Sequence, residues 1–518
     1  MIALVHEAFA KFWRQHPALL YALFVLLAIS LALDQKFWLF LIPCSFLLIS
    51  FAKQNFENVS RLLLALLLFF GVFIFVKVHV KHPQHLPIDG IKGIAYIDVS
   101  SLTSKKTSFG KNWIYRGTIK TFIPDDRSSA LSAYNIPYSI SLPQDHKIKR
   151  PLADGVYRVQ GILKQTSTGN YFLKIAKNDP WFPIEGSWSL AEYRFNAKKA
   201  VSDYISKHIF KPRSAAFLAG IATGEFDDKI MAFEFARFGL QHIMAISGFH
   251  FAIVAAILSV ILRTMISQRL AYMLLMLLLT TYFIFLGCGP SITRAWASIT
   301  IALLGFLLGK RSFALNSMGI AMMIILLIDP FLYQNIGFQF SFLTTAAILC
   351  FFTTTQELAQ SFFDKRALSS AIKLSTFDQH CYFILASFRQ AAALGIAVNL
   401  IALPISLYYF HKFPLLSLLY NLFFPFMVSI SMLLLILGFL FSLVPFVGDT
   451  IHTLNSFYTE FMLNFAYNLP TTWDITLRTS QLTSEILLIY LCSVFFVGIV
   501  ARHIVLKRKE SVQDFAFM

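Results

Sequence analysis

The stretch GLQHIMAISGFHFAI, Gly239 to Ile253, decides the fold class and holds the first candidate site. It places His242, Ser247 and His250 inside a segment that is otherwise apolar enough to cross a bilayer. On one continuous helix, at about 100° per residue, these side chains fall within an arc of about 140°. Polar groups at membrane depth are costly, so they normally face a cavity, a channel or another helix. Two interpretations follow: a polar path, or close helix packing with the hydroxyl bonded back to its own backbone.

The composition is typical of a polytopic membrane protein and excludes an ordinary soluble domain. Of 518 residues, 57% are hydrophobic, 16% aromatic and only 14% charged. The formal net charge of +17 attracts anionic lipid and anionic ligands such as nucleic acid, although positive cytoplasmic loops alone give many membrane proteins this sign. The five cysteines form no CxxC pair or other metal-ligand spacing, so we expect no metal site and no cofactor.

Apolar runs divide the chain. Three of them open it, at 18–33, 37–52 and 62–76, and a polar region follows from about residue 79 to residue 196. The later runs are 240–262, 270–288, 292–308, 313–328, 338–352, 391–410, 415–444 and 486–504. The run 415–444 contains Pro425 and is too long for one simple span, so we expect a broken or re-entrant helix there.

Positive charges predict the orientation. With Lys11 and Arg14 inside, the third span exits and leaves residues 79–196 outside. The basic residues of the later loops and the Lys-Arg-Lys cluster at 507–509 then also lie inside. We therefore predict a multi-pass protein of the cell (inner) membrane with both termini cytoplasmic. The segment 445–484 must contain another crossing or lie along the membrane surface.

These patterns predict a polytopic α-helical membrane protein with a small external all-β, OB-like domain. Five regions are expected: N-terminal transmembrane helices at 1–78, the β-rich domain at 79–196, amphipathic or interfacial helices at 197–238, a transmembrane core at 239–444, and C-terminal helices with a basic tail at 445–518. The β domain has candidate strands at 91–99, 113–123, 138–142, 156–165 and 171–176. Five short strands suit an OB-fold or any other small all-β domain, and periodicity does not separate the two.

The external domain carries candidate nucleic-acid contacts. It contains 16 Lys and Arg against 9 Asp and Glu, with aromatic residues beside the basic ones in its strands. Basic groups and stacking rings are what single-stranded DNA needs, each stacked base contributing about 1–3 kcal/mol. In the alternative interpretation the aromatic residues form the core. The candidates are Trp113, Tyr115, Arg116, Tyr157, Arg158, Tyr171 and Lys174.

A second candidate group begins the predicted span GPSITRAW, where Ser291 and Arg294 share one side. Arg294 lies about one turn inside the outer membrane boundary. It either extends to the interface or lines a pore, where its guanidinium matches a passing phosphate.

Amides near predicted turns and prolines form the third group. Gln339 follows the helix stop Asp329-Pro330, and Asn399 and Asn421 each precede a proline. Freed backbone groups at such breaks find partners in a cavity, or the amides simply cap the helices. The acidic residues at 225–228 are expected to form a solvated turn and not a metal site.

Several motifs resemble those of the ComEC family of competence proteins, in the same order along the chain. ATGEFDDKI at 222–230 resembles the family's Gly-Glu/Asp segment, GLQHIMAISGFH resembles its signature, and GPSITRAW resembles its Ser-x-x-Arg-Ala element. DPFLYQNIGFQFSFL at 329–343 is similar to the Asp-Pro…Gly-Phe-Gln-Leu-Ser element, with Phe340 replacing Leu, and NLIALP and NLFFP resemble the closing Asn/Pro helices. The set covers roughly residues 215–426, and the N-terminal region matches by pattern only.

The resemblance implies an inner-membrane channel that passes single-stranded DNA into the cytoplasm during natural transformation. It implies that His242, Ser247, His250 and Arg294 line the pore without catalytic roles, so we expect no enzymatic activity. Many members also carry a metallo-β-lactamase-like domain with a His-x-His-x-Asp-His cluster, and this sequence holds no such cluster. We expect any nuclease to be a separate protein.

The expected partners are single-stranded DNA, the lipid bilayer, a DNA-receptor protein outside and a helicase-type motor inside, because no GxxxxGK[ST] loop is present. Oligomerisation stays open. Two other functions compete: a transporter or flippase for another anionic polymer or lipid, and a membrane-embedded enzyme using Ser247. A channel tolerates Ser247→Ala better than Arg294→Glu, an enzyme loses all activity with Ser247→Ala, and a lipid flippase does not bind single-stranded DNA through residues 79–196.

Overall fold

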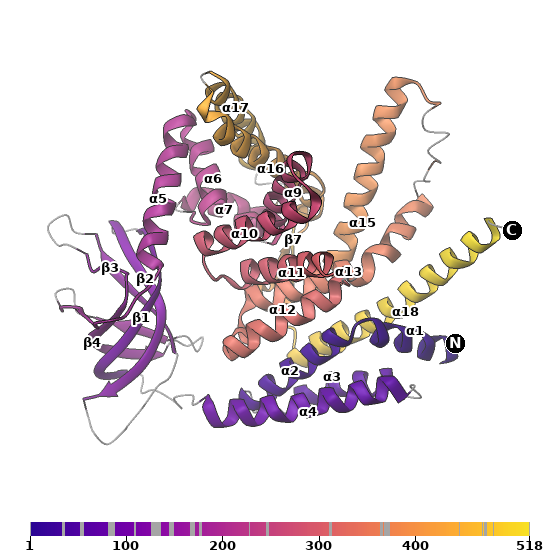
Figure 1. The fold of residues 1–518 in the computed structure, drawn as a ribbon, viewed down its shortest axis with the longest axis horizontal. Coiled ribbons are helices and arrows are strands. Elements are labelled where there is room, and N and C mark those ends of the chain that lie inside the picture. The colour runs from indigo at the N-terminus through magenta and orange to yellow at the C-terminus, as the bar shows by residue number, and fades with distance from the viewer. Residues whose placement is uncertain are drawn as a thin grey trace.

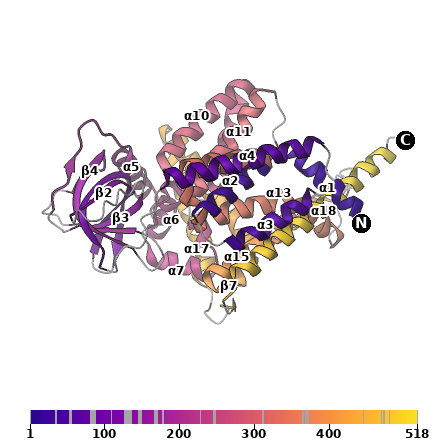
Figure 2. The same cartoon turned by 90° about the horizontal axis from the view of Figure 1, so that it is seen from below.

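The computed structural model describes residues 2–33, 37–51, 56–80, 89–107, 110–125, 136–144, 150–165, 171–175, 179–226, 228–244, 248–309, 313–362, 366, 373–444, 446–468, 470, 474–479 and 481–516. A small β domain lies at one end of the molecule, helices make up the rest, and both termini lie at the opposite end (Figure 1). The second view shows the same arrangement (Figure 2).

Four helices open the chain: α1 (Ile2–Gln15), α2 (Pro17–Leu33), α3 (Phe37–Ser50) and α4 (Phe56–His79). α1 and α2 meet at a bend of 90°. Asn316 of α12 (Ala314–Ile328) holds this bend, because its Nδ2 donates to the Gln15 carbonyl oxygen at 2.8 Å and its Oδ1 accepts from the Ala18 N–H at 3.2 Å. α2 then packs against both α4 and α12.

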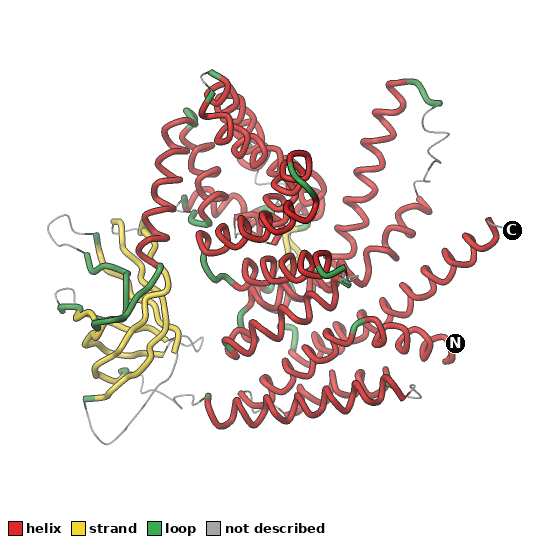
Figure 3. The backbone as a smooth tube through the Cα atoms, viewed as in Figure 1, coloured by secondary structure: helices red, strands yellow, loops and turns green. Residues whose placement is uncertain are grey.

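The β domain consists of β1 (Ile91–Thr107), β2 (Gly110–Pro124), β3 (Ile136–Pro143), β4 (Val156–Gln165), β5 (Tyr171–Lys174) and β6 (Phe182–Pro183). All its pairings are antiparallel, in the order β3-β2-β1-β4-β5, with β6 on β4. β3 also contacts β5, so the sheet curls almost into a barrel. All five predicted strands occur, and Figure 3 shows that strands dominate only this part.

Three helices connect the β domain to the rest: α5 (Ala191–His208), α6 (Pro212–Thr223) and α7 (Lys229–Arg237). α5 contacts β1, α6 and α10 (Gln268–Leu286). Its apolar side packs against α6, because Ile205 and the C-cap residue Ile209 are buried in one cluster with Leu218. On its polar side, Lys198 pairs with Glu225 at 3.0 Å.

The remaining helices are α8 (Gln241–Met244), α9 (Gly248–Met265), α11 (Pro290–Leu307), α13 (Ile336–Phe362), α15 (Thr376–Phe410), α16 (Leu416–Leu440), α17 (Val447–Tyr467) and α18 (Ser484–Ala516). Two 3₁₀ turns, η1 (Pro330–Gln334) and η2 (Phe441–Leu443), and the strand pair β7 (Lys412–Pro414) and β8 (Thr476–Arg478) lie between them. Lys507 of α18 pairs with Glu7 of α1 at 2.9 Å, so the two ends of the chain lie together.

Among the described residues, seven helices are long and apolar enough to cross a membrane, or eight if the bent pair of α1 and α2 forms one span. The seven include α4, α10, α11, α13, α15, α16 and α18. The protein is therefore a multi-pass membrane protein.

The expected helix breaks at the prolines are wrong. α15 continues through Pro404, and α16 continues through Pro425 to Leu440. A proline removes the hydrogen bond to the carbonyl four residues earlier, and its ring crowds that carbonyl, but a side chain of a neighbouring helix can supply a new donor. For Pro404 that carbonyl belongs to Leu400, and it accepts the Tyr490 hydroxyl of α18 at 3.0 Å.

Candidate functional site

Arg294 of α11 is the centre of a polar cluster among the membrane helices. Its Nε donates to Ser341 Oγ at 2.7 Å and its Nη1 donates to Thr345 Oγ1 at 2.5 Å. Both hydroxyls belong to α13 and lie one turn apart. Thr345 donates its own proton to the Ser341 carbonyl oxygen at 2.7 Å, which leaves its lone pairs for the guanidinium. The arginine is therefore held toward α13.

The signature segment touches the same guanidinium. A Cβ built on Gly248, the first residue of α9, would overlap Arg294 Nη2. Only a residue without a side chain lets the arginine cross the start of α9 in this way. Gly248 thus joins two motifs, ISGFH and SITRAW, that lie far apart in the sequence.

Among the described residues, no carboxylate pairs with the positive charge of the cluster. The ion pairs among the described residues involve other arginines and lysines, and Arg294 is not in any of them. The two neutral hydroxyls accept two of its five N–H groups but do not cancel its charge. A guanidinium in this state attracts an anion such as a phosphate group.

The two histidines of the signature lie in separately described helical segments, His242 in α8 and His250 in α9. Residues 245–247 between them lie outside the described residues, so the arc expected for one continuous helix stays a prediction. His242 is exposed, with Nδ1 at 3.1 Å from the Gly239 carbonyl oxygen, whereas His250 is buried in the first turn of α9. Ser247 lies outside the described residues.

The other residues predicted to line a pore make no hydrogen bond to Arg294 in the described part of the chain. Ser291 is half-buried in the first turn of α11. Gln339 links two segments, because its Nε2 donates to the Tyr333 carbonyl oxygen at 2.9 Å and its Oε1 accepts the Tyr409 hydroxyl at 2.6 Å. Asn399 donates to the Gly395 carbonyl oxygen of its own helix at 2.8 Å, and Asn421 is half-buried in α16.

Ser341 and Thr345 were not predicted from the sequence. Their i, i+4 spacing puts both hydroxyls on one face of a helix, which is a local signal. What the sequence does not contain is that this face meets Arg294, 47 and 51 residues away along the chain.

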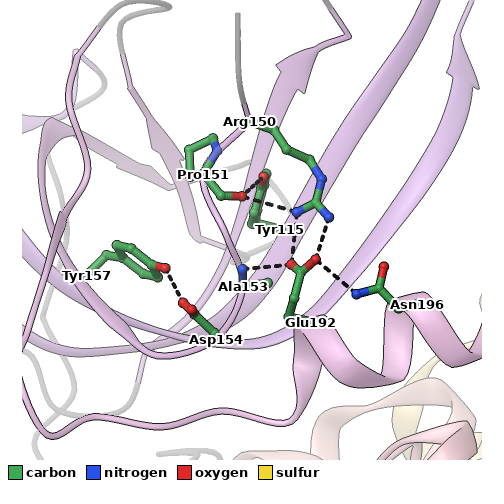
Figure 4. Close-up of polar contacts among 8 residues, drawn as sticks. All are labelled: Tyr115, Arg150, Pro151, Ala153, Asp154, Tyr157, Glu192 and Asn196. Carbon is green, nitrogen blue, oxygen red and sulfur yellow. Dashed lines mark hydrogen bonds and ion pairs between the residues drawn. The ribbon is translucent and has the colours of Figure 1, made fainter.

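In the β domain, two of the predicted stacking residues belong to the core. Tyr115 is fully buried and its hydroxyl donates to the Pro151 carbonyl oxygen at 2.7 Å, and Tyr157 is 5% exposed and donates to Asp154. Figure 4 shows the hydroxyl of Tyr115 directed at Pro151 and that of Tyr157 directed at Asp154. Burial raises the pKa of Tyr115 to about 12. The prediction that these two rings stack on DNA is wrong, because neighbours on a strand point to opposite faces and their basic neighbours point outward.

The basic candidates are exposed: Arg116 on β2, Arg158 on β4 and Lys174 on β5. Trp113 is half-buried, edge-on to Phe195 with ring centroids 5.4 Å apart, and the guanidinium of Arg150 lies 5.1 Å from its centroid. The side chain of Tyr171 lies outside the described residues. Arg116 and Arg158 therefore face outward, while the rings of their chain neighbours Tyr115 and Tyr157 face the core.

Arg150 and Glu192 join the β domain to α5. Two N–H groups of Arg150 donate to the two Glu192 carboxylate oxygens at 2.9 and 2.5 Å, and the Ala153 N–H donates to the same carboxylate at 3.0 Å (Figure 4). These hydrogen bonds from Arg150 and Ala153 outweigh burial and hold the pKa of Glu192 below its usual value.

In the acidic segment at 225–228, the described acidic residues stabilise the fold. Glu225 pairs with Lys198, and Asp228 caps α7 by accepting from the N–H groups of Ile230 and Met231. No group of three or more His, Cys, Asp or Glu residues in the described part of the chain is placed to hold a metal ion.

The fold and the cluster define a class: a multi-pass membrane protein with a nearly closed β domain outside the helices and a cationic site between them. Comparison with known proteins then gives the family. The profile of the family described as Competence protein matches residues 224–503, more than half of the chain. The chain belongs to the Competence protein family, which confirms the resemblance and connects it with competence.

One curated relative is ComE operon protein 3 of Bacillus subtilis (strain 168), 27% identical over 218 residues. The alignment covers 41% of this chain and 25% of the relative, so it spans about a quarter of the relative's length. No solved structure matches the chain.

Proposed function

We propose that this protein is a channel that passes single-stranded DNA through the inner membrane into the cytoplasm during natural transformation. The observation that carries the proposal is the Arg294 cluster. A guanidinium that forms no ion pair with any carboxylate of the described residues lies among membrane helices, against the glycine of the family signature. A charge at this depth is costly and is retained where an ion or substrate uses it.

The chemistry of the ligand fits the cluster. Single-stranded DNA presents one phosphate per nucleotide, and a guanidinium binds phosphate through parallel N–H donors. Nε and Nη1 are used by Ser341 and Thr345, so the remaining N–H groups are those available to an anion. In this proposal Arg294 binds each phosphate transiently and performs no covalent chemistry, and the protein is not an enzyme.

The β domain supports the same function from outside. Its strand order β3-β2-β1-β4-β5 with β3 near β5 is that of a small barrel, and we propose that it is OB-like and receives the strand. We also propose cytoplasmic termini, a DNA-receptor protein outside and a helicase-type motor inside. The pairing of Glu7 with Lys507 supports a common side for the two ends.

The experiment follows fluorescent DNA and transformation frequency in cells that lack this gene and are complemented with variants. The channel predicts that DNA reaches the envelope but not the cytoplasm of the deleted cells, and that transformants disappear. Arg294→Glu should fail to complement and Arg294→Lys should complement in part, each at normal membrane abundance. Normal DNA import in deleted cells would contradict the proposal.

The same variants separate the alternatives. If Ser247→Ala abolishes activity in a folded and inserted protein while Arg294→Gln retains it, the protein is an enzyme and not a channel. If DNA import continues in the deleted cells while the distribution of an anionic lipid changes, it is a flippase.

A further inference from the structure

The structure contains a second set of exposed rings and cations on the outer side of the sheet, which differs from the set predicted by sequence. On β4 the buried residues Tyr157, Val159 and Leu163 alternate with outward-facing Arg158, Gln160, Ile162 and Lys164. Because side chains of directly paired residues share a face of the sheet, the strand pairings identify the neighbours of each outward residue.

Two aromatic residues flank Arg158. Tyr96 of β1 pairs with Arg158 on one side, and Phe182 of β6 pairs with it on the other. Tyr96 is half-buried and Phe182 is 57% exposed. The guanidinium of Arg158 therefore lies between two aromatic rings in one row across β1, β4 and β6.

Further along β4 the same face is mainly cationic. Ile162 pairs with Lys92 of β1 and with Lys174 of β5, and Lys164 pairs with Phe172. Lys92 and Lys174 are exposed, and Lys164 and Phe172 are half-buried. We call this surface the β4 face, and its members are Lys92, Tyr96, Arg158, Lys164, Phe172, Lys174 and Phe182.

The cations of the β4 face form no ion pair with the described residues of the domain. The ion pairs there are Lys120 with Asp98 and Arg150 with Glu192, and neither involves Lys92, Arg158, Lys164 or Lys174. Asp98 also faces outward, two residues from Tyr96, and Lys120 holds it at 3.5 Å. The β4 face thus has a positive charge available to an anionic ligand.

We propose that the β4 face binds single-stranded nucleic acid, with bases stacking on Tyr96, Phe172 and Phe182 and phosphates contacting the four cations. From Arg158 to Lys164 the strand rises about 20 Å, which suits a few extended nucleotides. Stacking requires unpaired bases, so a duplex binds more weakly. In Figures 1 and 2, β4 lies at the end of the molecule remote from the termini. The inference deepens the proposed function, on which its ligand rests.

The test uses the full chain in nanodiscs of neutral lipid and a labelled oligo-dT of about 12 nucleotides. Phe182→Ala and Tyr96→Ala should each weaken binding about tenfold. The triple variant K92A/R158A/K174A should lower the salt dependence of log K by about two, since each lost phosphate contact removes about 0.7. Arg158→Glu, a surface change that leaves the core intact, tests the face if an aromatic variant fails to fold.

Arg116→Ala is the control, because Arg116 is also an exposed cation of the sheet but pairs with Ser139 of β3 and Ser101 of β1, away from β4. It should leave the affinity within about twofold. Equal losses in R116A and R158E, or equal affinity for duplex, would overturn the β4 face as the site. So would binding to anionic vesicles without binding to the oligonucleotide.

DNA import in cells distinguishes the two proposals. If deleted cells import no DNA but the β4-face variants bind oligo-dT normally, the channel stands and the β4 face is wrong. If deleted cells import DNA normally, the channel is wrong, and the binding measurements still decide whether the β4 face binds the strand.

Discussion

The Nε of Arg194 donates to the carbonyl oxygen of Ile284 at 2.8 Å, in the last turn of α10. Its Nη1 donates to the Ser100 carbonyl oxygen of β1 at 2.9 Å, so one guanidinium joins the β domain to a membrane helix. A cation at a helix C-terminus also interacts favourably with the helix dipole. This side chain therefore ties the β domain to the end of α10.

Replacing Arg194 by alanine should loosen this attachment without unfolding either part. Two charge-assisted hydrogen bonds, partly exposed, are lost at a cost of about 2 kcal/mol. Cross-linking between cysteines introduced into β1 and at the end of α10 should become slower and less specific. Arg194→Lys, which reaches one carbonyl at a time, should be intermediate, and unchanged cross-linking in R194A would show that other contacts hold the domain.

Gly248→Ala tests the contact between the signature and Arg294. The added methyl overlaps Nη2, so the guanidinium must shift from its position against Ser341 and Thr345 or α9 must move. We expect transformation to fall at least tenfold with the protein still present in the membrane. Gly395→Ala in α15 is the control, because its Cβ would meet only Leu422 Cδ2, at 4.0 Å, and it should behave as wild type.

Tyr490→Phe should destabilise the protein by about 1 kcal/mol, because the Leu400 carbonyl loses the donor that replaces the missing N–H of Pro404. Thermal unfolding in detergent measures this change. Pro404→Ala supplies the N–H again, so Y490F should have little effect in the P404A background. An equal effect in both backgrounds would mean that the hydroxyl does not compensate for the proline.

Acid should weaken the junction between the β domain and α5. The pKa of Glu192 is lowered in the folded protein by hydrogen bonds from Arg150, so its contribution is complete above the unfolded-state pKa of about 4.3 and is lost as the pH falls through the lower folded-state value. Glu192→Gln should cost about 2 kcal/mol at neutral pH. The difference in Tm between wild type and E192Q should shrink below about pH 4. If the difference in Tm between wild type and E192Q does not change with pH, then packing, and not the ionised carboxylate, stabilises the junction.

Much of the fold can be predicted from local patterns. Apolar runs locate the long helices because a bilayer demands about 20 apolar residues in succession, and period-2 alternation locates β1 to β5. The signature and the SITRAW motif identify the family from their order alone. These features depend on neighbours in the chain, which a sequence displays directly.

The chain's own sequence thus determined that this is a multi-pass membrane protein with a small β domain, and that it belongs with competence proteins. Tertiary structure decided which side chains act together. Alternation requires Tyr115 and Arg116 to face opposite ways, but only the closed sheet decides that the tyrosine is inside. Likewise Arg294 meets Ser341 and Gly248, and Tyr490 meets Leu400, only because helices distant in sequence pack together. Such contacts depend on three-dimensional packing, which no local period encodes.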